Sequence, residues 1–470
     1  MSSHRRSFAL PLPLNPLAAC LAALLAVTDA GATPVRPAGA VVVTNCLDSG
    51  GGSLRQAVID SGPGDAIDLT QLTCSQITLT TGRIDVARDV LLQGPGSGLL
   101  TIDGANLDRI FNQNGPYQLA VYGMTLQRGY SNAFGGGCIY SKGPLLLNDT
   151  VITGCKVFDI ASSASYKGGG VLVNSSLSAI DSAIVDNEIY SSLGYTFGGG
   201  AFVSGDVLLA SSTISGNTIS NASGGITDSG GIDVGGRLLM MYSTISNNSV
   251  DGLPGSPGSI GGARVAGGAV ISNSTISGNT ADGGVGGLRL YGSTGSPNVI
   301  TNSTISGNTA SAIGGVYARG PTTIANSTIA FNTETTFANG AGLRLAYSLA
   351  DIESSIIASN TSSGTTQNIG LGISGGVTGA NNLIGASPSV SLPPDTIGGD
   401  PVLLALADNG GPTKTHALGP GSPAIDAGNN NAALANDQRG TGFPRVVGVA
   451  PDIGAFEGVD TDRIFANGFD

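Results

Sequence analysis

Short runs in which apolar residues alternate with small polar residues fill most of the chain, and they show no helical period. A representative run is Ile271–Thr280 (ISNSTISGNT), which returns almost letter for letter as Ile300–Thr309. Alternation over a few residues is typical of a half-buried strand. Looser copies recur roughly every 30 residues, the signature of a repeat fold. Their landmark isoleucines are Ile152, Ile184, Ile214, Ile245, Ile276, Ile305, Ile329 and Ile356.

Each repeat therefore predicts two or three short strands separated by bends, with Gly-Gly runs such as Gly168–Val173 opening one of them. Strands that follow one another at a fixed pitch can bury their apolar faces only by stacking. The predicted fold is all-β, a right-handed parallel β-helix whose coils lie ~4.8 Å apart. In this register, Ile276 points inward between Ile245 and Ile305, and the Ser/Thr residues before each landmark isoleucine lie on the outer face.

An asparagine stands three residues after most of the landmark isoleucines. Asparagine tolerates the left-handed conformation at a bend, and stacked side-chain amides can hydrogen-bond from coil to coil. The pattern predicts an asparagine ladder at the bends, in which one rung contributes about 1 kcal/mol. The Asn-X-Ser/Thr triplets are interpreted as part of a turn ladder rather than as glycan acceptors. The ladder residues are Asn187, Asn217, Asn248, Asn279, Asn308 and Asn332.

Composition fits an elongated coil rather than a disordered chain. Of 470 residues, 75 are Gly and none is Trp; charged residues make up 11% and apolar residues 40%, which is enough for a large core. The net charge is −12 and there is no Lys/Arg cluster. This balance argues against nucleic acid as a partner and provides no polybasic membrane patch.

Residues 1–32 have the organisation of an export signal. His4, Arg5 and Arg6 precede an apolar stretch, and Ala30–Ala32 fits the small-x-small cleavage rule. The alternative is a lipoprotein, because Leu17–Cys20 resembles a lipobox. No later stretch is long and apolar enough to span a bilayer.

The chain has five cysteines, and removal of the signal would remove Cys20 and leave four. An even number of cysteines in an exported protein predicts disulfides. Cys46 with Cys74 and Cys138 with Cys155 is the simplest of the three connectivities. Cys155 occupies the asparagine position of the ladder.

Four further segments follow the signal. Residues 41–76 are expected to form an N-terminal cap, with one short helix at Gly52–Ser61 (GSLRQAVIDS). Solenoids need such caps to protect the terminal edge. Residues 77–365 are the β-helix repeats, about ten or eleven coils. In residues 366–459, prolines accumulate and the repeat disappears, which predicts irregular closing coils and a C-terminal cap. Residues 460–470 form a polar tail.

The C-terminal region resembles a known family. Asp400–Gly428 (DPVLLALADNGGPTKTHALGPGSPAIDAG), Asp437–Gly440 (DQRG) and Pro451–Glu457 (PDIGAFE) resemble the choice-of-anchor Q domain of bacterial surface proteins. That family pairs this domain with β-helix repeats like those of polymorphic outer-membrane proteins. Ser53–Val58 (SLRQAV) resembles the CSLREA-type motif, with Gly52 where that motif has its cysteine. The resemblance implies export and a cell-surface or secreted fate, and it implies no catalysis.

The rival class is a carbohydrate-active β-helix enzyme, either a polysaccharide lyase or a glycoside hydrolase. Such enzymes need clustered carboxylates, and the chain has no Asp-Asp pair. Arg289 and Arg344 follow Gly-Leu in their repeats and are expected on one outer face as solvated residues. His416 is the one histidine that remains after signal removal, so no Ser/His/Asp set or metal cluster is predicted. Arg439 and Asp452 are interpreted as turn or salt-bridge residues.

The sequence thus predicts an exported outer-membrane, cell-surface or secreted protein with an adhesin-like or structural role. We expect no catalytic, cofactor-binding or metal-binding residues. Two partners are expected: an unidentified surface glycan or protein ligand, and secretion or sorting machinery that contacts the tail. The tail itself has two interpretations, a sorting peptide or a last strand tucked against the cap.

Overall fold

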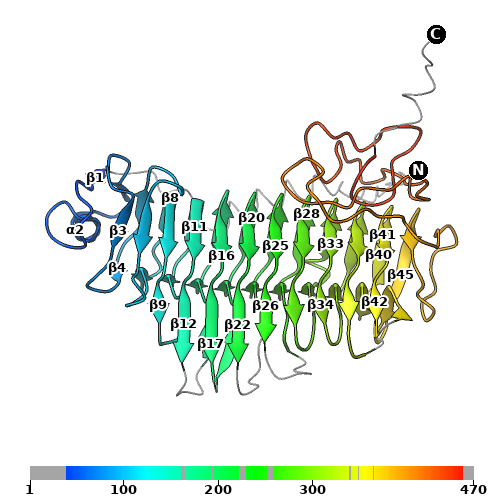
Figure 1. The fold of residues 1–470 in the computed structure, drawn as a ribbon, viewed down its shortest axis with the longest axis horizontal. Helices are drawn as coiled ribbons and strands as arrows, with labels where there is room; N and C mark the ends of the chain where they lie inside the picture. The colour runs from blue at the N-terminus through cyan, green and yellow to red at the C-terminus, as the bar shows by residue number, and fades with distance from the viewer. Residues whose placement is uncertain are drawn as a thin grey trace, which may run out of the picture.

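The computed structural model describes residues 39–159, 165–192, 194–221, 229–251, 258–337, 340–347, 349–363 and 365–458. In these ranges the chain winds into a solenoid of parallel strands, with one helix at its N-terminal end (Figure 1). The predicted all-β parallel β-helix is confirmed. The predicted signal (1–32) and tail (460–470) lie outside the described residues.

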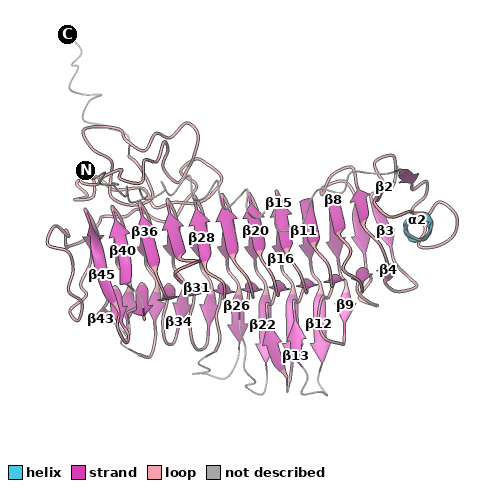
Figure 2. Ribbon diagram, turned by 180° about the vertical axis from the view of Figure 1, so that it is seen from behind, coloured by secondary structure: helices cyan, strands magenta, loops and turns pink. Residues whose placement is uncertain are grey.

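Three long sheets run along the solenoid, and we name them A, B and C (Figure 2). Sheet C begins only at β9 (Tyr130–Ser131), after the first coils. Sheet A has 23 strands, which form two parallel rows. The two rows belong to one sheet because β8 and β11 are long enough to continue from one row into the other. Its first row is β1 (Ala40–Val42), β2 (Asp65–Asp68), β5 (Val90–Gln93), β8 (Leu119–Gln127), β11 (Leu145–Thr153), β15 (Leu177–Ile180), β20 (Val207–Ala210), β24 (Leu238–Met241), β28 (Ala269–Ser272), β32 (Asn298–Thr301), β36 (Thr322–Ala325), β40 (Leu349–Glu353) and β45 (Gly376–Ala380).

The second row of sheet A, together with the end of β11, carries the landmark isoleucines. The row contains β3 (Gln76–Thr78), β6 (Thr101–Asp103), β16 (Ala183–Val185), β21 (Thr213–Ser215), β25 (Thr244–Ser246), β29 (Thr275–Ser277), β33 (Thr304–Ser306), β37 (Thr328–Ala330), β41 (Ile356–Ala358) and β46 (Leu383–Ile384). The prediction is wrong at the last landmark, because Ile357 rather than Ile356 pairs with Ile329, and Ile356 packs against the C-terminal region instead.

Sheets B and C complete each coil. The eleven strands of sheet B are β4 (Ile84–Val86), β7 (Phe111–Gln113), β10 (Ile139–Ser141), β14 (Val171–Val173), β19 (Ala201–Val203), β23 (Ile232–Val234), β27 (Ala263–Val265), β31 (Leu288–Tyr291), β35 (Val316–Arg319), β39 (Leu343–Ala346) and β44 (Ile369–Leu371). The ten strands of sheet C are β9 (Tyr130–Ser131), β12 (Lys156–Asp159), β17 (Glu188–Ser191), β22 (Thr218–Asn221), β26 (Ser249–Asp251), β30 (Thr280–Ala281), β34 (Thr309–Ala310), β38 (Thr333–Glu334), β42 (Thr361–Ser362) and β43 (Thr365–Thr366). A separate pair is β13 (Ser165–Lys167) and β18 (Tyr195–Phe197).

One coil runs through sheet B, the two rows of sheet A, and sheet C, as in β23, β24, β25 and β26. Most coils in the middle of the solenoid therefore contain four strands rather than the expected two or three. The additional strand arises because a short bend divides the chain within sheet A. In this coil the bend consists of Tyr242 and Ser243, which separate β24 from β25. Tyr242 has a positive φ of 49°, which turns the chain sharply enough to begin a new strand at once.

The predicted register is confirmed at the core. Ile276 pairs in parallel with Ile245 on one side and Ile305 on the other, and all three side chains are completely buried. The same stacking continues through one apolar core that extends from the N-terminal end to Ile384. Burial of these stacked branched side chains is the main stabilising contribution to the solenoid.

The asparagine ladder is present, but the asparagines do not adopt the left-handed conformation. The side-chain amide of Asn279 donates to Asn308 Oδ1 at 2.8 Å, and Asn248 donates to Asn279 Oδ1 at 2.9 Å. The positive φ falls on the residue before the ladder asparagine, such as Asn247 (54°) and Gly278 (66°). That residue turns the chain, and the turn directs the next side chain into the core.

A second ladder, of serines, runs beside the landmark isoleucines. In the coil of Ile276, Ser274 Oγ donates to the carbonyl of Ser272 at 2.7 Å and accepts from the backbone N–H of Ser243 at 3.2 Å. The sequence predicts that both the serine and the threonine of Ser-Thr-Ile lie on the outer face of the strand. The prediction is correct for the threonine and wrong for the serine, whose side chain is buried at the bend. The buried hydroxyl satisfies backbone groups at the bend between the two rows of sheet A.

The N-terminal end is closed by helix α2 (Leu54–Asp60), as predicted. Ser53 caps the helix by accepting a hydrogen bond from the N–H of Gln56, and the apolar side of the helix contacts the end of the core. The helix ends one residue before Ser61, which is extended.

Both expected cysteine pairs are present. The Cα atoms are 6.4 Å apart for Cys46–Cys74 and 5.5 Å apart for Cys138–Cys155. The backbone N–H of Cys155 donates to Asn187 Oδ1 at 3.0 Å, so this cysteine begins the asparagine ladder.

The C-terminal end of the solenoid is closed by a last coil and by the irregular segment that follows it. Strands β44, β45 and β46 add a closing coil, and Val390 and Leu392 then pack against the exposed end of the core. Residues 398–458, which contain no helix or strand, turn back and lie along the side of sheet A beside β28, β33 and β41 (Figure 1). The irregular segment therefore covers the flank of the last coils as well as their end. No helix among the described residues has the length and apolar character needed to cross a membrane.

Candidate functional site

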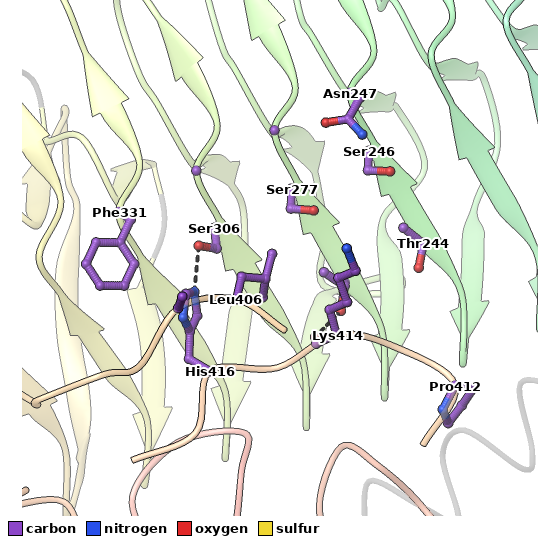
Figure 3. A pocket seen from close by; sticks show the side chains of 14 residues that line it. Thr244, Ser246, Asn247, Ser277, Ser306, Phe331, Leu406, Pro412, Lys414 and His416 are labelled. Atoms are coloured by element: carbon purple, nitrogen blue, oxygen red, sulfur yellow. Dashed lines mark hydrogen bonds between the residues drawn. The ribbon is translucent and has the colours of Figure 1, made fainter. Parts of the chain in front are cut away.

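A groove lies between the second row of sheet A and the returning C-terminal segment (Figure 3). Its volume is about 630 Å³. Small polar side chains of the solenoid form its floor, including Ser246, Ser277 and Ser306. Lys414 and His416 close it from the C-terminal side.

His416 is fixed to the floor of this groove through both ring nitrogens. Its Nδ1 lies 2.7 Å from the carbonyl oxygen of Leu404, and its Nε2 lies 2.7 Å from Ser306 Oγ. A carbonyl can only accept, so Nδ1 carries the proton and the neutral ring accepts the Ser306 hydroxyl at Nε2. Burial lowers the pKa of His416, which favours this neutral form. The Phe331 ring is tilted against the imidazole, with centroids 5.0 Å apart.

A serine hydroxyl bonded to a neutral imidazole is the first half of a nucleophile–base arrangement. In an efficient triad, a carboxylate orients the imidazole and stabilises it when it becomes charged, whereas Leu404 supplies an uncharged carbonyl. Among the described residues that line the groove there is no Asp or Glu. Ser306 and His416 are also each 3% exposed. The hydrogen bond between Ser306 and His416 attaches the C-terminal segment to β33.

Gln438 attaches the C-terminal region to the solenoid through several side-chain hydrogen bonds. Its Nε2 donates to Thr275 Oγ1 at 2.9 Å and to Thr413 Oγ1 at 3.0 Å. Its Oε1 accepts from Thr304 Oγ1 at 2.6 Å. The outward threonines of two successive repeats thus bind one buried amide, which holds the C-terminal region in register with the coils.

The asparagines of the three Asn-Ser-Thr triplets attach the same region. Each has a positive φ at the bend before its serine, and each side-chain amide donates to a backbone carbonyl of the C-terminal region. The pairs, at 2.8 to 3.2 Å, are Asn273 with Asp437, Asn302 with Asn436, and Asn326 with Asn429.

These triplets are therefore docking elements, and their interpretation as ladder positions is wrong for the asparagine. A sequence signal for docking was present. Asp181 and Ser211 occupy the equivalent bend in earlier coils, and Asn begins at residue 273. The signal is partial, because two coils that the C-terminal region contacts have other residues at this bend. Tyr242 lies against Gly440, and the backbone N–H of Asn429 donates to Ser354 Oγ at 2.6 Å.

The motifs that resemble the choice-of-anchor Q domain form one bonded cluster. Arg439 is 2.6 Å from Asp437 and lies between the rings of Phe443 and Phe456, at 4.1 and 3.9 Å. Arg445 is fully buried and 2.8 Å from Glu457.

Protonation in this cluster is set by burial and by its neighbours. Burial raises the pKa of Glu457 to about 7 against the opposing effect of Arg445, and burial also raises the pKa of Asp452. Asp452 accepts from the N–H groups of Asp426 (2.9 Å) and Gly458 (2.6 Å). These contacts give Arg439 and Asp452 structural roles in holding the irregular segment together.

The two arginines singled out by their spacing lie on the outer face of sheet B. Arg289 and Arg344 each pair with Tyr317, from β31 and β39 respectively, so they share one row with the tyrosine between them. No group of three or more His, Cys, Asp or Glu side chains that could hold a metal ion occurs among the described residues.

The stacked parallel coils, the two ladders and the attached C-terminal segment define a β-helix repeat protein. Residues 145–329 match the family model described as "Right handed beta helix region". No curated protein matches the chain. A solved structure with a similar course of the chain is the "Crystal structure of pectate lyase Pel9A", with a TM-score of 0.40 and 15% sequence identity over 90% of this chain and 97% of that one. At that level of similarity the match carries no argument about activity. The family match ends before the residues that resemble the choice-of-anchor Q domain, so that resemblance stays an expectation.

Proposed function

We propose that this chain is an exported β-helix protein, held at the cell surface or released from it, whose role is structural or adhesive rather than catalytic. The observation that carries the proposal is the cysteine pairing. All four cysteines outside the export-type segment lie in two pairs at bonding distance. Disulfides form and persist mainly in oxidising, extracytoplasmic compartments, so the pairs support the export signature of residues 1–32.

The architecture supports display rather than turnover. The solenoid has a continuous apolar core and ladders of buried amides and hydroxyls, which make it a stiff elongated scaffold. The C-terminal region is attached along its flank by Gln438, His416 and three asparagines, which leaves the outer faces of sheets B and C uncovered by that region (Figure 1). Long exposed sheet faces of this kind suit an adhesive surface.

The alternative is a carbohydrate-active enzyme, and the groove over Ser306 is where its chemistry would be sought. A neutral His416 could serve as a base toward the Ser306 hydroxyl. Such a reaction would require the C-terminal segment to move, because both groups are almost completely covered. We therefore rank this alternative below the display role.

Two measurements test the proposal. Cells that produce the full chain are fractionated and treated with external protease, with thiol labelling of the recovered protein. We expect protease-accessible or secreted protein without free thiols. Protein retained in the cytoplasm with free thiols would overturn export.

The second measurement incubates purified full-length protein with neutral and acidic polysaccharides and follows new reducing ends and unsaturated products. We expect none above the level of a Ser306→Ala variant. Product that depends on Ser306 or His416 would overturn the non-catalytic role and favour the enzyme.

A further inference from the structure

The outer face of sheet B carries a strip of cations interspersed with aromatic rings, which we call the cation–aromatic strip. Its arginines come one from each of four successive strands, β27, β31, β35 and β39: Arg264, Arg289, Arg319 and Arg344. Tyrosines Tyr291, Tyr317 and Tyr347 lie among them, and Tyr347 is 51% exposed. The guanidinium carbons lie 5.0 to 5.9 Å from the ring centroids in three of these contacts.

Charge is distributed unevenly along the chain, and the strip is where positive charge is concentrated. The chain has a net charge of −12, and between residues 238 and 413 its only Lys or Arg residues are the four arginines of the strip. If these cations served only solubility, they would be expected on several faces. Placing all four on one face of consecutive coils produces a local positive row on an acidic molecule.

Two of the arginines lie next to each other in the row. Arg264 pairs directly with Arg289 in the parallel ladder, and like charges directly opposite each other are destabilising. Asp233, buried in the adjacent coil, offsets part of this through its 3.0 Å contact with Arg264. A contact with a ring face also fixes the plane of the guanidinium.

Earlier coils continue the pattern on the same face. Lys167 lies 4.4 Å from the ring centroid of Phe202 in β19, and Arg109 lies 5.4 Å from that of Tyr140 in β10. Five of the eight cation–ring contacts among the described residues thus involve a ring in sheet B or, for Tyr347, directly after β39. One joins Lys167 to Phe197 in the separate β13–β18 pair, and the other two belong to Arg439. The arrangement is linear, and it repeats at the coil spacing of ~4.8 Å.

We propose that the cation–aromatic strip binds a linear acidic polysaccharide along the axis of the solenoid, with arginines on its carboxylate or sulfate groups and tyrosine rings against its sugar faces. This inference rests on the proposed display function and names the ligand class. Arginine matches carboxylate and sulfate groups through paired N–H donors, and tyrosine supplies a rigid surface with a polar tip. A repeating ligand fits a repeating surface.

The overall charge favours a polysaccharide over nucleic acid. Duplex DNA carries one negative charge per ~1.7 Å of its axis, so an acidic rod with one row of four arginines would repel it at long range. A polysaccharide with about one anionic group per sugar has a lower charge density, and neutral sugar surface remains for the rings.

The test uses purified full-length protein and alginate, a linear polyuronate, in calorimetric or affinity-electrophoresis titrations. The variant is Arg289→Gln with Arg344→Gln. The control is Lys142→Gln with Lys156→Gln, which removes the same charge from exposed or half-exposed residues outside the four coils. We expect binding that weakens as salt is raised, and about a tenfold loss of affinity in the variant with little change in the control. Tyr347→Ser should weaken binding without altering its salt dependence.

Three outcomes would overturn the inference: no binding of alginate by the unaltered protein, equal loss in variant and control, or tighter binding of a single-stranded DNA oligonucleotide. Neutral methyl-esterified alginate should bind at least about tenfold more weakly. The result is separable from the proposed function. Surface display without alginate binding refutes the ligand alone, whereas alginate that is bound and cleaved supports the ligand and refutes the non-catalytic role.

Discussion

Removing one amide from the asparagine ladder should destabilise the protein far more than the loss of one hydrogen bond. Asn279 is completely buried and joins three coils. Its Nδ2 donates to Asn308 Oδ1 at 2.8 Å and to the carbonyl of Ile245 at 3.0 Å. Its Oδ1 accepts from both the side chain (2.9 Å) and the backbone N–H (3.1 Å) of Asn248.

Asn279→Ala removes these four hydrogen bonds together. The backbone N–H of Asn248 loses its acceptor inside the core, which costs about 1–3 kcal/mol, and each of the other three bonds contributes about 1 kcal/mol. The expected loss in the free energy of unfolding is about 4–6 kcal/mol, larger than the value of about 1 kcal/mol suggested by the sequence pattern alone. The difference arises because each ladder amide serves a backbone group as well as its neighbour.

Urea unfolding followed by circular dichroism measures this loss, and hydrogen exchange at the Asn248 amide reports it locally. Asn174→Ala is the matched control, because Asn174 is exposed and makes one long contact of 3.4 Å with Tyr140. The control should change stability by less than about 0.5 kcal/mol. If Asn279→Ala costs less than about 1 kcal/mol, or no more than the control, the ladder does not hold the coils together.

The core, the cysteines and the groove each give a further prediction. Ile276→Asp places an unpaired carboxylate between Ile245 and Ile305 and should cost more than about 4 kcal/mol, or leave no folded protein; a mild effect would show that the register is wrong. Non-reducing peptide mapping of exported protein should find Cys46 linked to Cys74 and Cys138 linked to Cys155, and four free thiols would contradict the oxidising-compartment argument. Burial lowers the pKa of His416 below its ordinary value of 6.5, so the unfolded chain binds the additional proton first. Stability should therefore fall as the pH drops below about 6.5, and the fall should be smaller in His416→Gln; identical pH profiles would refute it.

The repeat pattern was sufficient to predict the solenoid, the capping helix and the inward isoleucines, except that Ile357 rather than Ile356 takes the inward position. Alternation sets which side chains turn inward, and a fixed repeat length leaves stacking as the only way to bury them. The pattern could not assign the bends correctly, because Ser, Asn and Gly are all common in turns. Whether Gly278 or Asn279 turns the chain depends on a positive φ at a single residue, which is 66° at Gly278. The serine that faces the core is likewise set by the bend before it, as at Asn273 (50°).

The groove and the cation–aromatic strip were less predictable. The contacts of His416 and Gln438 join residues more than a hundred positions apart, with no local period to reveal them. The equivalent spacing of Arg289 and Arg344 did show that they share a face. The tyrosines beside them became meaningful only when the strand register placed Tyr317 between the two arginines.

The central claim is that each residue of the Asn-Ser-Thr-Ile motif has a distinct structural role. Asn and Thr bind the C-terminal region, Ser forms the inner ladder and Ile packs in the core. The most direct test is hydrogen exchange on a triple variant, Asn273→Asp, Asn302→Asp and Asn326→Asp. Aspartate retains tolerance of the positive φ, as Asp181 shows at 47° in an uncovered coil, but it has no amide to donate. We predict faster exchange in residues 398–458 with unchanged protection in the solenoid. Unchanged exchange in that region, or loss of protection throughout the coils, would contradict the account.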